Sequence, residues 1–377
     1  MGTDTAISEM EKAYTRAREL CRQTGKTSQL CQILGQLATM HYVRAEYQRA
    51  LELGNEALDL AQQAEDPLLV ELSHWRLGFI LFPLGEYTAA RTHFGQMLAS
   101  YEPQHHQPLV LLCGANAGLS ALAYDACCLW CLGYPEQALK QSQEALTLAR
   151  ELDHPFSLAD VASFSGCMLN DMRRDAQALK NDSEELVRLA VDWDMPTWLA
   201  YATRHRGQAL VMLGQIPEGM AQIREGMAAG EATDVQLYLP RTLCSLAEAQ
   251  VEAGHPEEGL ATIAEALALM EQTDERHWEA ELLRVRAELL LKQGDEAEAE
   301  ASLRNAEACL QRAIEAARRQ HAKSWELRAT TSLARLWQQQ GKTGEAHQVL
   351  AEIYGWFTEG FDATDLKEAK SLLDSLS

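Results

Sequence analysis

The stretch LGEYTAARTHFGQML, residues 84–98, contains the pattern that decides the fold. A glycine, which readily ends a helix and reverses the chain, is followed by small residues that open a second helix. Near copies recur at RAEYQRALELGNEAL (44–58), LGYPEQALKQSQEAL (132–146), LGQIPEGMAQIREGM (213–227), AGHPEEGLATIAEAL (253–267) and QGKTGEAHQVLAEIY (340–354). More divergent copies are MRRDAQALKNDSEEL (172–186) and an interrupted one across 293–314. Such internal similarity is typical of a repeat protein.

The spacing of these copies gives the length of the repeat. The small residues that open the second helices are Ala50, Ala90, Ala138, Ala178, Gly219, Gly259, Ala306 and Ala346, so successive gaps are 40, 48, 40, 41, 40, 47 and 40 residues. Turn glycines precede most of them, at Gly85, Gly133, Gly214, Gly254, Gly294 and Gly341. Within the units, apolar residues recur at intervals of three and four, the period of a half-buried helix. We therefore predict an all-α array of about eight helix-turn-helix units.

This pattern resembles the tetratricopeptide repeat. The second unit fills the family's marker positions most completely, with Leu77, Gly78, Gly85, Tyr87, Ala90 and Phe94. The resemblance implies a right-handed α-solenoid in which each unit packs only on its neighbours, so that the array behaves as one extended domain. The period near forty resembles the long-helix variant of bacterial regulatory proteins, including the sensor domain of a maltotriose-responsive transcription activator.

The C-terminal part of the chain carries a second resemblance. Its segments are similar to the repeat arm that closes bacterial multidomain nucleotide-cyclase and P-loop ATPase signalling proteins, and they lie at 277–294, 322–346 and 354–376. The phosphate-binding loop G-x-x-x-x-G-K-[ST] of such proteins does not occur in this sequence. The resemblance therefore implies that a catalytic domain precedes residue 1 in the full gene.

The repeat pattern divides the chain into three expected parts. Residues 1–27 are expected to form a partial repeat that retains only its second helix. The tetratricopeptide-like array is expected to cover residues 28–362, and a C-terminal capping helix residues 363–377.

The balance of charges narrows the classes of partner. The chain has 33 basic and 55 acidic residues, for a net charge of −22. Nucleic acids and anionic membranes bind through clustered Lys and Arg, so we expect neither as a partner. The N-terminus lacks the basic start and apolar core of a signal peptide. Nine scattered cysteines indicate reduced thiols, so we expect a cytoplasmic protein.

The concave side of the array is the expected binding surface. In the repeat family, the second, fifth, ninth and twelfth positions of each first helix point into the groove, because three- and four-residue steps share a helix face. This register predicts an aromatic N-terminal half and a C-terminal half rich in Arg and Glu. The residues predicted to bind there are Trp75, Phe79, Phe82, Trp130, Tyr201, Arg204, Gln208, Arg241, Glu248, Arg284, Glu288, Arg328 and Arg335. The register also places Thr39, Tyr42 and Asp160 on this face.

Each half of the groove admits two interpretations. The aromatic residues favour a peptide or partner helix, unless they pack between helices. The arginines suit a carboxylate or phosphate, unless they pair with Glu248, Glu281 and Glu288. We expect a regulatory module that binds a protein, a peptide or a small anionic ligand, as the sensor arm of a larger signalling protein. The alternative is a stand-alone scaffold or adaptor.

Catalytic and metal-binding motifs are missing from the sequence. It contains no G-x-S-x-G, H-E-x-x-H or G-x-G-x-x-G signature, so we expect neither an enzyme nor a cofactor. Cys127, Cys128 and Cys131 include a Cys-x-x-Cys pair, but a helix divides them between two faces and no second pair occurs. We therefore expect no metal. Cys128 should pack between helices, whereas Cys127 and Cys131 should face the groove beside Trp130.

Overall fold

Helices and short turns make up the described chain. The computed structural model describes residues 3–101, 106–233, 235–292 and 299–377, and no β-strand occurs among them. The N-terminal helices are α1 (Thr3–Thr24), α2 (Thr27–Val43), α3 (Tyr47–Gln63), α4 (Pro67–Leu81), α5 (Tyr87–Ser100), α6 (His106–Cys113), α7 (Ala117–Cys131), α8 (Pro135–Glu151), α9 (Pro155–Val161), a π-helical segment (Ala162–Met168) and α10 (Leu169–Met172). They are followed by α11 (Ala176–Asp192), α12 (Pro196–Met212), α13 (Ile216–Ala232), α14 (Leu239–Glu252), α15 (Pro256–Thr273), α16 (Glu279–Lys292), α17 (Ala299–Arg319), α18 (Lys323–Gln339), α19 (Thr343–Tyr354) and α20 (Thr364–Leu376).

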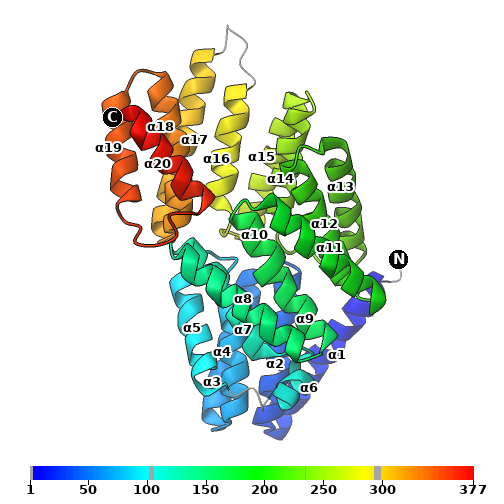
Figure 1. Ribbon diagram of the computed structural model, residues 1–377. Coiled ribbons are helices and arrows are strands. Elements are labelled where there is room, and N and C mark those ends of the chain that lie inside the picture. Colours follow the sequence, from blue (N-terminus) through cyan, green and yellow to red (C-terminus); the bar gives the residue numbers. More distant parts are fainter. Residues whose placement is uncertain (1–2, 102–105, 234, 293–298) are drawn as a thin grey trace.

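Successive helices pack in pairs, and each pair is one repeat of a tetratricopeptide-like α-solenoid. The pairs within the described residues are α2 with α3, α4 with α5, α7 with α8, the broken helix α9–α10 with α11, α12 with α13, α14 with α15, α16 with α17, and α18 with α19. We number them repeats one to eight. The final helix, α20, lies against α18 and α19. Figure 1 shows the first repeats in blue and cyan at the bottom and the last in orange and red at the upper left.

Glycines and small residues explain why the pairs form. The turn glycines of the described residues all have positive φ, a conformation that glycine adopts at little steric cost: Gly85, Gly133, Gly214, Gly254 and Gly341. Gly294 lies outside the described residues. A Cβ on Gly78 would come within 2.4 Å of the Phe94 ring, so this glycine lets α4 and α5 approach closely. The fully buried Ala50, Ala90 and Ala346 have the same role in their own pairs.

The array coils back on itself, so that the turn inside an early repeat lies against the start of the repeat five places later. The backbone carbonyl of Val43, in repeat one, accepts from Gln236 N–H at 3.0 Å, just before repeat six. Pro83 O, in repeat two, accepts from Arg276 N–H at 2.7 Å, just before repeat seven. Trp130 O, in repeat three, accepts from the Ser324 hydroxyl at the start of repeat eight.

Buried side chains strengthen the same contacts. The Tyr42 and Tyr238 hydroxyls are 2.9 Å apart. Tyr47 donates to Glu275 at 2.8 Å, and Tyr87 donates to the backbone oxygen of His277 at 3.1 Å. The expectation that each unit packs only on its neighbours is therefore wrong for this chain. A forty-residue repeat coils tightly enough for the second turn of the superhelix to rest on the first.

Candidate functional site

Three aromatic residues of the predicted groove line a large cavity in the first turn of the superhelix. The cavity has a volume of about 570 Å³. Nine aromatic rings line it: Tyr42, Trp75, Phe79, Tyr124, Phe156, Phe164, Trp193, Trp198 and Tyr201. Three of them, Trp75, Phe79 and Tyr201, belong to the predicted binding set. We call this space the aromatic cavity.

The first helices of five consecutive repeats meet at the aromatic cavity. They contribute Thr39 and Tyr42 from α2, Trp75 and Phe79 from α4, Ser120 and Tyr124 from α7, Phe156 and Asp160 from α9, and Trp198 and Tyr201 from α12. Val235 and Leu237 add part of the wall from the connection between α13 and α14. In that connection, Gln236 N–H also donates a hydrogen bond to Val43 O of repeat one. The stacking of the two turns of the superhelix therefore shapes the cavity.

A π-helical segment lies where repeat four borders the cavity. It covers Ala162–Met168 and carries Phe164, whose ring stacks on Tyr124 at 3.9 Å between centroids. Asp160 lies two residues before it, at the end of α9. Widened turns of this kind occur often at functional sites, because they redirect side chains that a regular helix would place elsewhere.

Several residues that line this apolar space carry polar atoms without partners. Within the described residues, Trp75 Nε1, Ser120 Oγ, Asp160 Oδ2 and the Tyr201 hydroxyl are buried without a hydrogen-bond partner. An unpaired buried polar atom costs about 1–3 kcal/mol. Four residues around one cavity carry such an atom.

Asp160 is the most unusual of these groups. It is 9% exposed, and no basic residue is among the described residues that line the cavity. Burial raises the pKa of its carboxyl to about 6, with the Ser120 hydroxyl acting in the opposite direction. The carboxylate is therefore predominantly ionised at neutral pH, although no cationic side chain of the described chain pairs with it.

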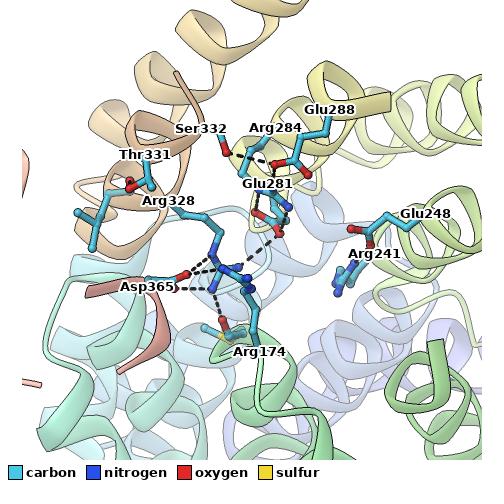
Figure 2. Close-up of polar contacts among 12 residues, drawn as sticks. Arg174, Arg241, Glu248, Glu281, Arg284, Glu288, Arg328, Thr331, Ser332 and Asp365 are labelled. Atoms are coloured by element: carbon cyan, nitrogen blue, oxygen red, sulfur yellow. Dashed lines mark hydrogen bonds and ion pairs between the residues drawn. The ribbon is translucent and has the colours of Figure 1, made fainter. Parts of the chain in front are cut away.

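The arginines predicted for the C-terminal groove are paired with carboxylates of the chain itself. Figure 2 shows Glu281 between Arg284 and Arg328. Arg284 lies 2.8 Å from the Glu281 carboxylate and also bonds to Glu288. Although burial alone would raise the pKa of Glu281, Arg284 and Arg328 hold it below its usual range. We call these residues and their partners Arg174, Arg241, Glu248, Arg335, Asp365 and Glu368 the charged cluster.

Helix α20 supplies two acids of the charged cluster. Asp365 lies 2.7 Å from Arg328 and 3.1 Å from Arg174. Glu368 lies 2.9 Å from Arg335. The cluster surrounds a space of about 180 Å³, in which arginine and carboxylate side chains alternate. Pairing of arginine with acid, one of the two interpretations left open by the sequence, is therefore the arrangement found.

The middle of the predicted groove is almost filled. Tyr201, Arg204, Gln208 and Arg241 surround a space of only about 10 Å³. Arg241 lies 2.6 Å from Asp171, and Arg204 donates to the Leu237 oxygen at 3.1 Å. These side chains join α12 and α14 to neighbouring elements and leave no room for a ligand.

Two predicted groove residues lie in the core. Phe82 is fully buried, and its ring centroid is 4.2 Å from that of His277. Trp130 is 2% exposed, between Trp325 and the Arg328 guanidinium. Their placement on an open groove is therefore corrected, because the stacked second turn covers the face that the register assigns to them.

The three clustered cysteines are all buried, and this corrects the expectation that two of them face an open groove. Cys127, Cys128 and Cys131 are each fully covered. Burial raises the pKa of all three thiols. Among the described residues, no group of three His, Cys, Asp or Glu side chains is arranged to hold a metal ion. No helix in the described ranges has both the length and the apolar character of a membrane span.

The sequence reasoning missed part of the aromatic cavity. Tyr124, Phe156, Phe164, Trp193 and Trp198 were not predicted, because they lie outside the four groove positions of their helices or in a turn. The lone Asp160 was placed on the groove face but not selected. The sequence signal for this residue is an acid among apolar residues, four positions before the aromatic Phe164.

Comparisons with known proteins agree on the fold. No protein-family model and no curated protein matches the chain. A Rap protein complexed with the competence and sporulation factor aligns with a TM-score of 0.55, 10% identity and coverage of 93% of this chain and 98% of the other. The Rap conjugation gene regulator of plasmid pLS20, in complex with the Phr* peptide, aligns with a TM-score of 0.56, 12% identity and coverage of 76% and 74%.

A signal transduction ATPase with numerous domains and a tetratricopeptide repeat sensor, from Pyrococcus horikoshii, aligns with a TM-score of 0.46 and 11% identity. The alignment covers 98% of this chain and 54% of that one. At these identities the likenesses define the chain as a tetratricopeptide-like helical repeat protein and bear on its fold alone.

Proposed function

We propose that this chain is a non-catalytic recognition module that binds a peptide segment in the aromatic cavity. The observation that carries the proposal is the cavity itself. Its volume of about 570 Å³ lies within the range of ligand sites, which is about 300–1,000 Å³. Its aromatic walls and few unpaired polar atoms have the composition of a binding pocket rather than of a packing defect.

Two further features support a peptide as the ligand. Phe156 and Trp193 are 41% and 60% exposed at the edge of the cavity, so a bound segment could continue over apolar surface outside it. Exposed aromatic residues beside a pocket are typical of peptide recognition. In addition, one of the similar structures is described as a complex with a peptide.

A random heptapeptide phage library, selected on the full-length chain, tests this function. We expect enriched peptides to lose binding about tenfold or more in the Trp198→Ala variant, because aromatic residues in a pocket dominate peptide affinity. The matched control is Arg335→Ala, a half-exposed member of the charged cluster that lies outside the cavity. Peptides that bind both variants equally well, or that lose binding to Arg335→Ala alone, would contradict the proposal.

A further inference from the structure

The charge inside the aromatic cavity indicates which chemical group the ligand carries. The two charged residues among the described lining residues are both acids, Asp160 and Asp194. Asp194 is exposed at the edge, whereas Asp160 lies at 9% exposure among the aromatic rings. A carboxylate held away from water without a cationic partner is unfavourable unless a ligand compensates for it.

The aromatic rings add a second preference for positive charge. Ring faces attract cations, and a site with several rings around one carboxylate is suited to an ammonium group. The Trp75, Phe79 and Tyr124 side chains line the same cavity as this acid. Within the described chain, no neighbouring arginine pairs with this acid. Arg204 bonds to Leu237 O, Arg241 pairs with Asp171, and the Arg76 guanidinium lies 5.7 Å from the centre of the Trp75 ring.

We propose, as a refinement that rests on the proposed function, that the Asp160 carboxylate binds an ammonium group of the peptide. In this arrangement the Asp160 carboxylate accepts a hydrogen bond from the ammonium, and the aromatic rings enclose the carbon chain that carries it. The ammonium belongs either to the amino terminus of the peptide or to a lysine side chain. Both sources supply the same chemistry.

The effect of Asp160 on stability also favours a role in binding. Burial raises the pKa of Asp160, so the ionised side chain opposes folding at neutral pH while the cavity is empty. A neutral residue would be more favourable for stability alone. A group that is unfavourable for stability and central to a pocket has the characteristics of a ligand-binding residue.

Titration with a matched pair of small probes tests the inference. 2-Phenylethylamine and 2-phenylethanol have the same ring and chain length, but only the amine is charged at pH 7.5. We expect the wild-type chain to bind the amine about tenfold or more tightly than the alcohol, as measured by calorimetry or by tryptophan fluorescence. Equal affinities would overturn the inference without using any variant.

Two substitutions assign the effect to one carboxylate. Asp160→Asn should abolish the preference for the amine, whereas Asp194→Asn should keep it. Asp194 has a φ of 52°, which asparagine tolerates well, so this control should fold normally. Asp160→Asn should melt no lower than wild type at pH 7.5, because it removes a buried charge. A folded Asp160→Asn variant that still prefers the amine would overturn the inference.

Blocked amino acids distinguish the two sources of the ammonium. Phenylalanine amide is compared with its N-acetylated form, and N-acetyl-lysine amide with N-acetyl-norleucine amide. Tighter binding of the free amine in the first pair assigns the amino terminus, and tighter binding in the second assigns lysine. If neither pair differs while neutral heptapeptides still bind the cavity, the ammonium inference fails and the proposed function stands. If no library peptide depends on Trp198, the proposed function fails as well.

Discussion

Glu275 illustrates how one buried carboxylate makes the fold sensitive to pH. It lies just before repeat seven, is 1% exposed, and accepts from the Tyr47 hydroxyl of repeat one at 2.8 Å. Burial raises the pKa of this carboxyl from 4.5 to about 7, with the Tyr47 hydrogen bond acting in the opposite direction. The folded chain therefore keeps a proton that the unfolded chain has lost across this interval. The free energy of unfolding should fall as the pH rises from about 4.5 to 7.

The Glu275→Gln variant should remove this dependence. An amide still accepts a hydrogen bond from Tyr47 but carries no charge. Between pH 4.5 and 8, the free energy of unfolding of the variant should therefore rise by about 3 kcal/mol relative to that of the wild type. Urea denaturation at several pH values measures the difference. Asp274→Asn, in the same loop but with a 40% exposed side chain, should change stability by less than about 1 kcal/mol. A Glu275→Gln variant that follows the wild-type pH profile would contradict the expectation.

At the residue scale, the repeat register predicted the direction of a side chain better than its exposure to solvent. It placed Tyr42, Trp75 and Asp160 on the inner face, and all three line the aromatic cavity. It placed Phe82 on the same face, where the side chain is buried beneath His277. The position of a residue along a helix determines the direction of its side chain. Whether that direction leads to solvent depends on contacts about 190 residues away, which a local pattern does not contain.

Helix α18 carries two arginines, Arg328 and Arg335, that were both predicted for the groove but that differ in burial. Arg328 is 4% exposed, with carboxylates of Asp365 and Glu281 at 2.7 and 3.4 Å. Arg335 has a 46% exposed side chain that pairs with Glu368. The two positions differ mainly in their burial, so they form a matched pair for measuring what the charged cluster contributes.

Alanine substitutions at Arg328 and Arg335 should lower the free energy of unfolding by very different amounts. Arg328→Ala removes the buried cation that Asp365 and Glu281 share and leaves them only Arg174 and Arg284, so it should lower the free energy of unfolding by about 3–5 kcal/mol. Arg335→Ala removes a surface pair and should cost about 1 kcal/mol or less. Urea denaturation at low and high salt measures both, and only the Arg335 effect should be screened by salt. Comparable losses in the two variants would show that burial does not separate them.

At the element scale, repeat length and turn position were the most predictable features. Turn glycines and buried alanines recur with the period because each pair must reverse and pack closely. The partners of the arginines were less predictable, since Arg174 pairs with Asp365, an acid 191 residues further along the chain. Ion pairing across that separation follows from how the superhelix closes rather than from any spacing in the sequence.

The whole molecule should unfold as one unit. In an open solenoid, the terminal repeats unfold first because they contact one neighbour only. Here repeats one to three are also bonded to repeats six to eight, through Val43, Pro83 and Trp130. Far-UV circular dichroism and tryptophan fluorescence should therefore give one coincident transition in urea. Separate midpoints for the two signals would show that the stacked turns unfold independently.

At the scale of the whole molecule, the sequence predicted the helical repeat architecture but not the contacts between the two turns of the superhelix. About eight repeats and a helix near the C-terminus followed from period and pattern. The role as sensor arm of a larger ATPase or cyclase, like the cytoplasmic location, stays a prediction.

Each of the first three repeats contacts the repeat five places later, and this fixed spacing restricts how the chain can evolve. Repeat proteins commonly gain or lose whole units, because each unit meets only copies of itself. In this chain, deletion of one unit between repeats one and six would bring Val43 opposite the loop that is shaped to meet Pro83. Every later contact between the two turns would be mismatched in the same way. We therefore expect homologues to keep the number of units between paired repeats while they vary in loops and surfaces.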